Sequence, residues 1–130
     1  MDTFVINGGK PLSGAIDVEG SKNAALPILA GALLIDGPTK LSNVPALKDI
    51  AVMSKLLAHL GATVDYDPDA GEMTIDGSTL NSGEAPYELV SQMRGAFVSL
   101  GPLLARLGSA KVSLPGGCSL GARPVDDHIK

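Results

Sequence analysis

The chain has no tryptophan, few other aromatic residues and a single cysteine among its 130 residues. One cysteine excludes an internal disulfide framework and is typical of a reducing compartment. Because only 3% of the residues are aromatic, the core must be built from Leu, Ile, Val and Ala. The hydrophobic fraction of 45% is high enough for a buried core, so the composition excludes a disordered chain.

Positive charge is also scarce, since 10 Lys and Arg residues stand against 14 Asp and Glu residues. The net charge of −4 argues against a nucleic-acid partner, which needs a basic face. The longest uncharged helical candidate, residues 23–35, is shorter than the roughly 20 residues that span a bilayer. The N-terminus carries Asp2 where a signal peptide carries basic residues. We therefore expect a soluble, cytoplasmic protein without a membrane partner.

Apolar periodicity predicts an α/β fold in which short strands alternate with amphipathic helices. Ser21 is a good N-cap for the first helix, and Gly37-Pro38 is a strong stop. The inward face of the second helix is expected to carry Leu47, Ile50, Ala51, Met53, Leu56, Leu57 and Leu60. The predicted elements are strands at 4–6 and 12–18, a helix from 21, a strand at 39–42, a helix at 47–60, strands at 63–66 and 72–75, a helix at 87–107 broken at Gly101-Pro102, and a strand at 110–114.

The pattern repeats once along the chain. Lys22 opens a helix that is followed by a strand with Lys40, and Arg94 and Lys111 stand in the same order about 71 residues later. Such a period indicates duplication of one α/β unit, with a first unit at 21–77 and a second at 78–130. The second copy stops near the start of its second helix, so we expect a piece of a longer protein.

Three cations indicate an anionic ligand. A positive side chain is unfavourable at a helix start, where Lys22 and Arg94 are predicted, unless an anion binds there. Arg123 offers a planar guanidinium that suits phosphate or carboxylate. Each charge alone is most simply a solvated surface residue. Their matching positions on an otherwise acidic chain favour the anion site.

The glycine-rich segment 115–124 holds the only cysteine, Cys118, with Arg123 five residues further on. Glycine allows the backbone to approach a ligand closely, and a cation near a thiol favours the reactive thiolate. A lone cysteine is more commonly a small buried apolar residue. The flanking glycines and the arginine favour the reactive interpretation here.

Other chemistries have little support in the sequence. His59 and His128 lack the further ligands that a metal site needs. Asp49, Asp65, Asp67 and Asp69 are most simply helix-start, turn and surface residues. The chain has no Walker A motif and no GxGxxG motif after a strand. We expect neither a metal nor an organic cofactor.

Two motifs, with Met93-Arg94 between them, carry a family resemblance over the whole chain. Residues 20–27 read Gly-Ser-Lys-Asn-Ala-Ala-Leu-Pro, and residues 115–126 read Pro-Gly-Gly-Cys-Ser-Leu-Gly-Ala-Arg-Pro-Val-Asp. On these motifs the chain resembles the N-terminal part of the UDP-N-acetylglucosamine 1-carboxyvinyltransferases, a branch of the enolpyruvyl transferase (EPSP synthase-like) family. The resemblance implies an inside-out α/β barrel of repeated α/β units, here one full unit and part of a second. It also implies that residues 1–20 pack in a second domain, which this chain does not contain.

The resemblance implies transfer of the enolpyruvyl group from phosphoenolpyruvate to the 3′-hydroxyl of UDP-N-acetylglucosamine, with release of phosphate. This is the first committed step of peptidoglycan synthesis. Lys22 and Asn23 would contact phosphoenolpyruvate, with Asn23 also near the sugar, and Cys118 would donate a proton to the enolpyruvyl methylene. Cys118 would also form a covalent adduct with phosphoenolpyruvate and be alkylated by fosfomycin. The remaining implied ligands of the anionic substrates and the uridine nucleotide are Arg94, Arg123, Pro124, Val125, Asp126 and Asp127.

Three other interpretations stay open. The related 3-phosphoshikimate 1-carboxyvinyltransferase shares the fold and the phosphoenolpyruvate chemistry. A non-catalytic module would bind an anion or a nucleotide without turnover. An incompletely folded piece would have no function of its own. In the family, a catalytic carboxylate and further arginines come from the other domain, so we expect the chain alone to be inactive.

Overall fold

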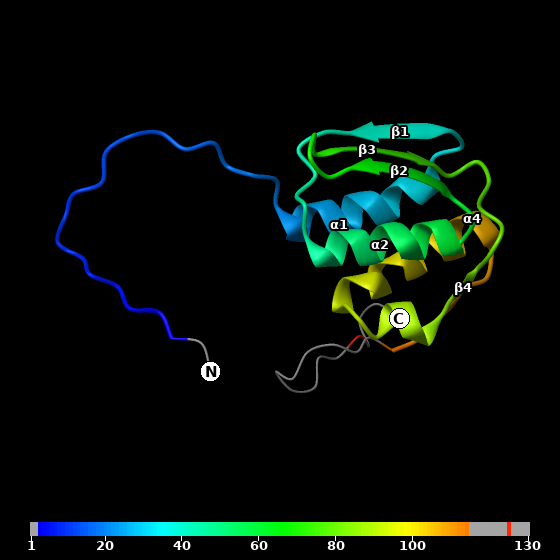
Figure 1. Ribbon diagram of the computed structural model, residues 1–130. Helices are drawn as coiled ribbons and strands as arrows, with labels where there is room; N and C mark the ends of the chain where they lie inside the picture. Colours follow the sequence, from blue (N-terminus) through cyan, green and yellow to red (C-terminus); the bar gives the residue numbers. More distant parts are fainter. Residues whose placement is uncertain (1–2, 115–124, 126–130) are drawn as a thin grey trace.

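The computed structural model describes residues 3–114 and Val125, and the helices and strands between residues 22 and 112 form stacked layers. Figure 1 shows the layer of α1 and α2 beneath a three-stranded sheet, with the later helices on the other side. In chain order the elements are α1 (Lys22–Gly31), η1 (Ala32–Leu34), β1 (Pro38–Leu41), α2 (Lys48–His59), β2 (Thr63–Asp67), β3 (Glu72–Asp76), β4 (Glu84–Ala85), α3 (Tyr87–Val90), η2 (Arg94–Ser99), α4 (Leu100–Leu107) and β5 (Lys111–Val112).

The first sheet is antiparallel, in the order β1-β3-β2. A tight turn joins β2 to β3, in which Oδ1 of Asp67 accepts hydrogen bonds from the backbone N–H groups of Asp69 and Ala70, each at 3.0 Å. A carboxylate that caps its own turn in this way favours a hairpin at this point. The strands predicted at 39–42, 63–66 and 72–75 are therefore confirmed.

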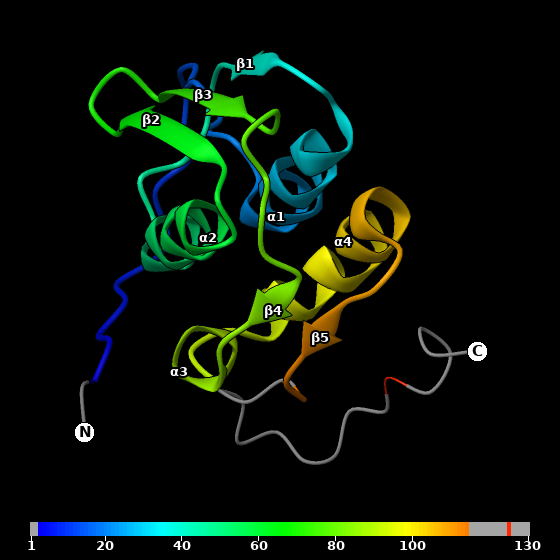
Figure 2. The same cartoon turned by 90° about the vertical axis from the view of Figure 1, so that its right-hand side faces the viewer.

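The second sheet is a short parallel pair, β4 with β5, which lies below α1 and α2 in Figure 2. Parallel strands need a crossover connection, and α3, η2 and α4 supply it here. Helix α1 lies between the first sheet and this crossover, as Figure 2 shows end-on. Its side chains Leu26, Leu29 and Ala30 are buried, and so is Leu33 in η1, which continues the helix.

Helix α2 buries a face that is shifted from the one its sequence predicts. Leu47 is 44% exposed and Ala51 is exposed, so these two inward predictions are wrong, whereas Val52 is 6% exposed. Leu47 is the N-cap and has an extended backbone, so it does not follow the helical period. Because α2 packs against α1, β2, α3 and η2, its buried face extends to Val52. The other five predicted positions, Ile50, Met53, Leu56, Leu57 and Leu60, are buried as expected.

The helix predicted over 87–107 is interrupted elsewhere than expected. The break falls after Val90, where Met93 has an extended backbone, and not at Gly101-Pro102. Pro102 is the third residue of α4, in a first turn whose N–H groups have no partner within the helix. Proline is tolerated there, so the predicted interruption at this point was wrong.

The strands predicted at 4–6 and 12–18 do not form. Residues 3–20 have no strand and no helix, and Figure 1 shows them as an extended arm away from the layers. A strand requires a partner for its backbone N–H and C=O groups, and β1 pairs with β3 only. The arm leaves Phe4, Leu12 and Ile16 at least 90% exposed.

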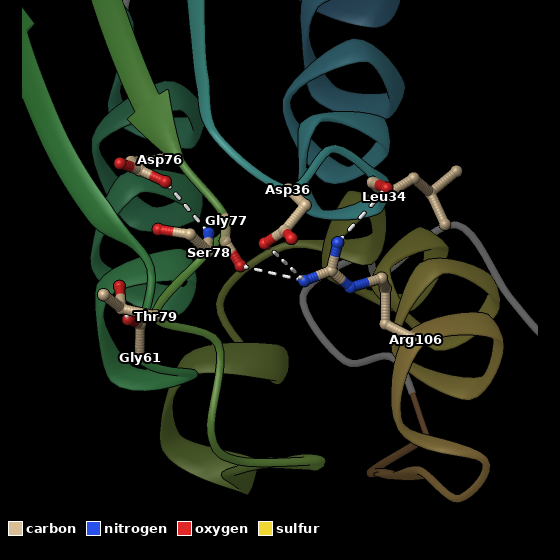
Figure 3. Close-up of polar contacts among 8 residues, drawn as sticks. All are labelled: Leu34, Asp36, Gly61, Asp76, Gly77, Ser78, Thr79 and Arg106. Atoms are coloured by element: carbon tan, nitrogen blue, oxygen red, sulfur yellow. Dashed lines mark hydrogen bonds and ion pairs between the residues drawn. The ribbon is translucent and has the colours of Figure 1, made fainter.

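Arg106 joins the two predicted repeat units. Its guanidinium donates to the carbonyl oxygens of Leu34 and Gly77, each at 3.4 Å, and lies 3.5 Å from Oδ1 of Asp36 (Figure 3). Leu34 ends η1, Gly77 follows β3, and Arg106 belongs to α4. One side chain of the second unit therefore holds two backbone segments of the first.

We expect Arg106→Met to lower the free energy of unfolding by about 1 kcal/mol, because two carbonyl groups lose a charged donor. Lys111→Met is the matched control: it removes an ion pair with Glu84 whose side chains are 79% and 62% exposed, and such a pair contributes little. Urea unfolding of both variants measures the difference. Equal stability losses in the two variants would contradict the role of Arg106.

Candidate anion-binding site

Lys22 is the first residue of α1, as predicted, and Ser21 is the N-cap. The Oγ of Ser21 accepts a hydrogen bond from the backbone N–H of Ala24 at 3.4 Å. Lys22 and Asn23 are exposed, next to backbone N–H groups that have no partner within the helix. Pro27 has no N–H to donate to the Asn23 carbonyl, as the next helical turn normally would. The start of α1 therefore offers both donors and an acceptor to a ligand.

Gly20 sets where α1 begins. A Cβ at this position would overlap the carbonyl oxygen of Asn43 and lie 3.1 Å from Cδ of Pro45. Only glycine lets the backbone before Ser21 approach this loop, which leads into α2. The Gly-Ser-Lys-Asn motif thus has a structural reason: its glycine places the starts of α1 and α2 side by side.

An ion pair joins these two helix starts. Nζ of Lys22 lies 2.9 Å from Oδ2 of Asp49, the second residue of α2. Lys48, the first residue of α2, adds an exposed cation at the same end. The site therefore keeps an excess of positive charge after Asp49 has neutralised one lysine.

Arg94 approaches the same helix from the second unit. It is exposed and is the first residue of η2, which packs on α1. A Cβ at the following residue, Gly95, would lie 2.7 Å from Cδ1 of Leu26, one turn after Lys22. The structure thus brings the start of η2, with Arg94, against the first half of α1.

Of the remaining predicted site residues, the structure describes only Val125. Cys118, Arg123, Pro124, Asp126 and Asp127 lie outside the described residues. Val125 is described and is 8% exposed. The roles predicted for these six residues stay predictions.

Other features of the described part do not add to the site. A shallow cleft of about 120 Å³ beside α1 is lined mostly by apolar side chains such as Ala24, Ile28 and Leu41, and neither Lys22 nor Arg94 lines it. Among residues 3–114 and Val125, no group of three or more His, Cys, Asp or Glu side chains could hold a metal ion. Within the same residues, no helix has the length and apolarity to cross a membrane.

The sequence analysis did not predict Lys48 and Asp49 as site residues. It gave Asp49 only as a helix-start or surface residue. The available signal was weak: a Lys-Asp pair directly before an apolar periodic run. Acidic residues are common in the first helical turn. Only the contact between α1 and α2 reveals that Asp49 faces Lys22.

Gly20→Ala tests whether close packing sets the start of α1. The added methyl group must displace the Asn43 carbonyl, so we expect a loss of about 1–3 kcal/mol in unfolding free energy. The matched control is Gly31→Ala: Gly31 has helical dihedral angles and nothing within 4 Å of an added Cβ. Alanine should stabilise that position by about 0.5–1 kcal/mol. Urea unfolding measures both, and a stable Gly20→Ala variant would contradict the assignment.

Comparison with known proteins identifies the family of the chain. The family model of EPSP synthase (3-phosphoshikimate 1-carboxyvinyltransferase) matches residues 6–130. Relatives named UDP-N-acetylglucosamine 1-carboxyvinyltransferase, from Acinetobacter baylyi and Trichlorobacter lovleyi, are 54% and 52% identical over 130 residues. These matches cover all of this chain but 31% and 30% of the relatives. The chain thus spans just under a third of their length.

A solved structure has the same fold. The enolpyruvyl transferase NikO from Streptomyces tendae matches with a TM-score of 0.69 and 31% identity, over 79% of this chain and 24% of that chain. The predicted enolpyruvyl transferase fold is therefore confirmed. Because the family model covers nearly the whole chain, the chain belongs to the EPSP synthase family of enolpyruvyl transferases.

Proposed function

We propose that the chain forms part of an enzyme that transfers the enolpyruvyl group of phosphoenolpyruvate to the 3′-hydroxyl of UDP-N-acetylglucosamine and releases phosphate. This reaction would take place in the cytoplasm and begin peptidoglycan synthesis. The observation that carries the proposal is the packing of η2, which begins at Arg94, against the first half of α1, which begins at Lys22. The names of the curated relatives support the choice of acceptor.

The charges of the site suit phosphoenolpyruvate, which carries a phosphate and a carboxylate. A helix N-terminus favours an anion through its free N–H groups and its partial positive charge. Lys22 adds an ammonium group at the start of α1, and Arg94 adds a guanidinium that can bind an oxyanion through two N–H groups. Asn23 supplies a neutral amide beside Lys22, which suits the sugar or the carboxylate.

The chemical step needs an acid at carbon. In the proposed reaction the acceptor hydroxyl would give its proton to the catalytic carboxylate of the other domain while its oxygen bonds to the central carbon of the enol group, and Cys118 would give its thiol proton to the methylene carbon. Loss of a proton and of phosphate then restores the double bond. Residues 123–127 would hold the uridine nucleotide, with Arg123 as its cation. We assign these roles by resemblance to the family.

The chain alone is proposed to be inactive. Residues 3–20 expose apolar side chains such as Phe4 and Ile16, both 90% exposed, which suits an arm that packs in another domain. Residues 21–77 and 78–130 would be successive repeat units, the second completed by further chain. That other domain would bring the catalytic carboxylate and further arginines.

A chimera tests the proposed activity. This chain replaces the matching 130 residues of the Acinetobacter baylyi relative, to which it is 54% identical. We expect phosphate release from phosphoenolpyruvate that depends on UDP-N-acetylglucosamine, and none with shikimate 3-phosphate, the acceptor suggested by the name of the family model. The isolated chain serves as the comparison and should release no phosphate.

Two results would contradict the proposal. A folded chimera that uses only shikimate 3-phosphate would assign the chain to the other branch of the family. Steady phosphate release by the isolated chain would show that no second domain is needed.

Fosfomycin labelling tests the role of Cys118 in the same chimera. We expect one covalent adduct by intact mass, formed faster with UDP-N-acetylglucosamine, because the nucleotide would complete the site around the thiol. Cys118→Ser is the control and should take up no label, since Cys118 is the only cysteine of this chain; any cysteine of the A. baylyi portion is replaced by serine beforehand. A labelling rate that does not respond to the nucleotide would contradict the assignment.

A further inference from the structure

We propose that Asp49 is a positioning residue, which holds the Lys22 ammonium where it binds the anionic group of phosphoenolpyruvate. The inference rests on the proposed function. It adds a residue that contacts the lysine and not the substrate. The lysine and the carboxylate come from different helices, α1 and α2.

The contact has the length of a charge-assisted hydrogen bond. Nζ of Lys22 is 2.9 Å from Oδ2 of Asp49, within the range for an ammonium and a carboxylate. The Asp49 side chain is 31% exposed, whereas Asp36 and Glu84, which also form ion pairs with basic side chains, are 79% and 62% exposed. Asp49 is therefore the best shielded of these three carboxylates, and water competes least for its lysine.

Asp49 is the fixed partner and Lys22 the adjustable one. Asp49 lies in the first turn of α2, directly before the fully buried Ile50. The backbone N–H of Ile50 bonds to the Leu47 carbonyl at 3.0 Å. Lys22 reaches Asp49 through a flexible four-carbon stem. The core thus holds the carboxylate, and the carboxylate orients the ammonium group.

The pair leaves Lys22 able to bind a ligand. An ammonium group has three N–H donors and Asp49 accepts from one face, so donors remain for a phosphate or carboxylate oxygen. Lys22 is 43% exposed, which keeps these donors within reach of a ligand. Without Asp49, the partial positive charge at the start of α1 would repel the ammonium group. Asp49 therefore cooperates with the substrate and does not compete with it.

A contribution to folding stability explains the Lys22–Asp49 ion pair less well than a contribution to substrate binding does. Ion pairs at this level of exposure contribute little to folding. Ordering a long side chain before the ligand arrives lowers the entropy lost on binding. The main effect of Asp49 should therefore appear in phosphoenolpyruvate binding.

Asp49→Asn in the chimera tests the inference. We expect the KM for phosphoenolpyruvate to rise roughly tenfold and the KM for UDP-N-acetylglucosamine to change less than twofold. Asp49→Glu should restore most of the phosphoenolpyruvate affinity, because it keeps the carboxylate. Asp36→Asn is the matched control: it removes the Arg106 partner elsewhere and should leave both KM values unchanged.

The outcomes separate this inference from the proposed function. If the unsubstituted chimera neither binds nor uses phosphoenolpyruvate, both fail. If it is active and Asp49→Asn matches it, only the positioning role is overturned. A lowered KM would show that Asp49 competes with the substrate. An equal rise in both KM values, without rescue by Asp49→Glu, would show a purely structural role.

Discussion

The burial of α1 on two sides is the constraint on which the rest of the structure depends. Helix α1 packs against α2 and η2, and η1, which continues it, packs against β3 and α4 (Figure 2). Leu29 and Leu33 are fully buried between these layers, and each such side chain contributes roughly 1.5–3 kcal/mol through the hydrophobic effect. The same packing fixes Lys22 relative to α2 and brings the start of η2 alongside.

Close backbone packing turns this general arrangement into a defined site. Gly20 and Gly95 stand beside the two cations, and a side chain at either would collide with its neighbour. The charges then follow from the helix starts: Lys22, Lys48 and Arg94 each occupy the first position of a helical segment. Cations in such positions are poorly suited to the helices themselves. Their placement is understandable if a bound anion neutralises the positive charge that these side chains and helix starts share.

The sequence predicted the features that depend on local chemistry. The Ser21 cap, the Asp67 turn and the apolar period of α2 each act within a few residues, and the structure has all three. Features that depend on distant contacts could not be predicted. The strands expected in residues 3–20 need a partner, and the role of Asp49 depends on a helix that starts 27 positions earlier at Lys22. Pro102 shows that a local pattern can also mislead. Gly101-Pro102 predicted a break in the helix, but proline is tolerated in the first turn of a helix, and Pro102 is the third residue of α4.

The central claim is that one anion binds between the starts of α1 and η2. Titration of phosphoenolpyruvate into the isotope-labelled chain, followed by the amide resonances, tests it most directly. The account predicts that the largest shifts fall at residues 22–25 and 94–96, and that Lys22→Ala weakens them at both helix starts together. Shifts at only one helix start, or shifts that survive Lys22→Ala unchanged, would contradict a shared site.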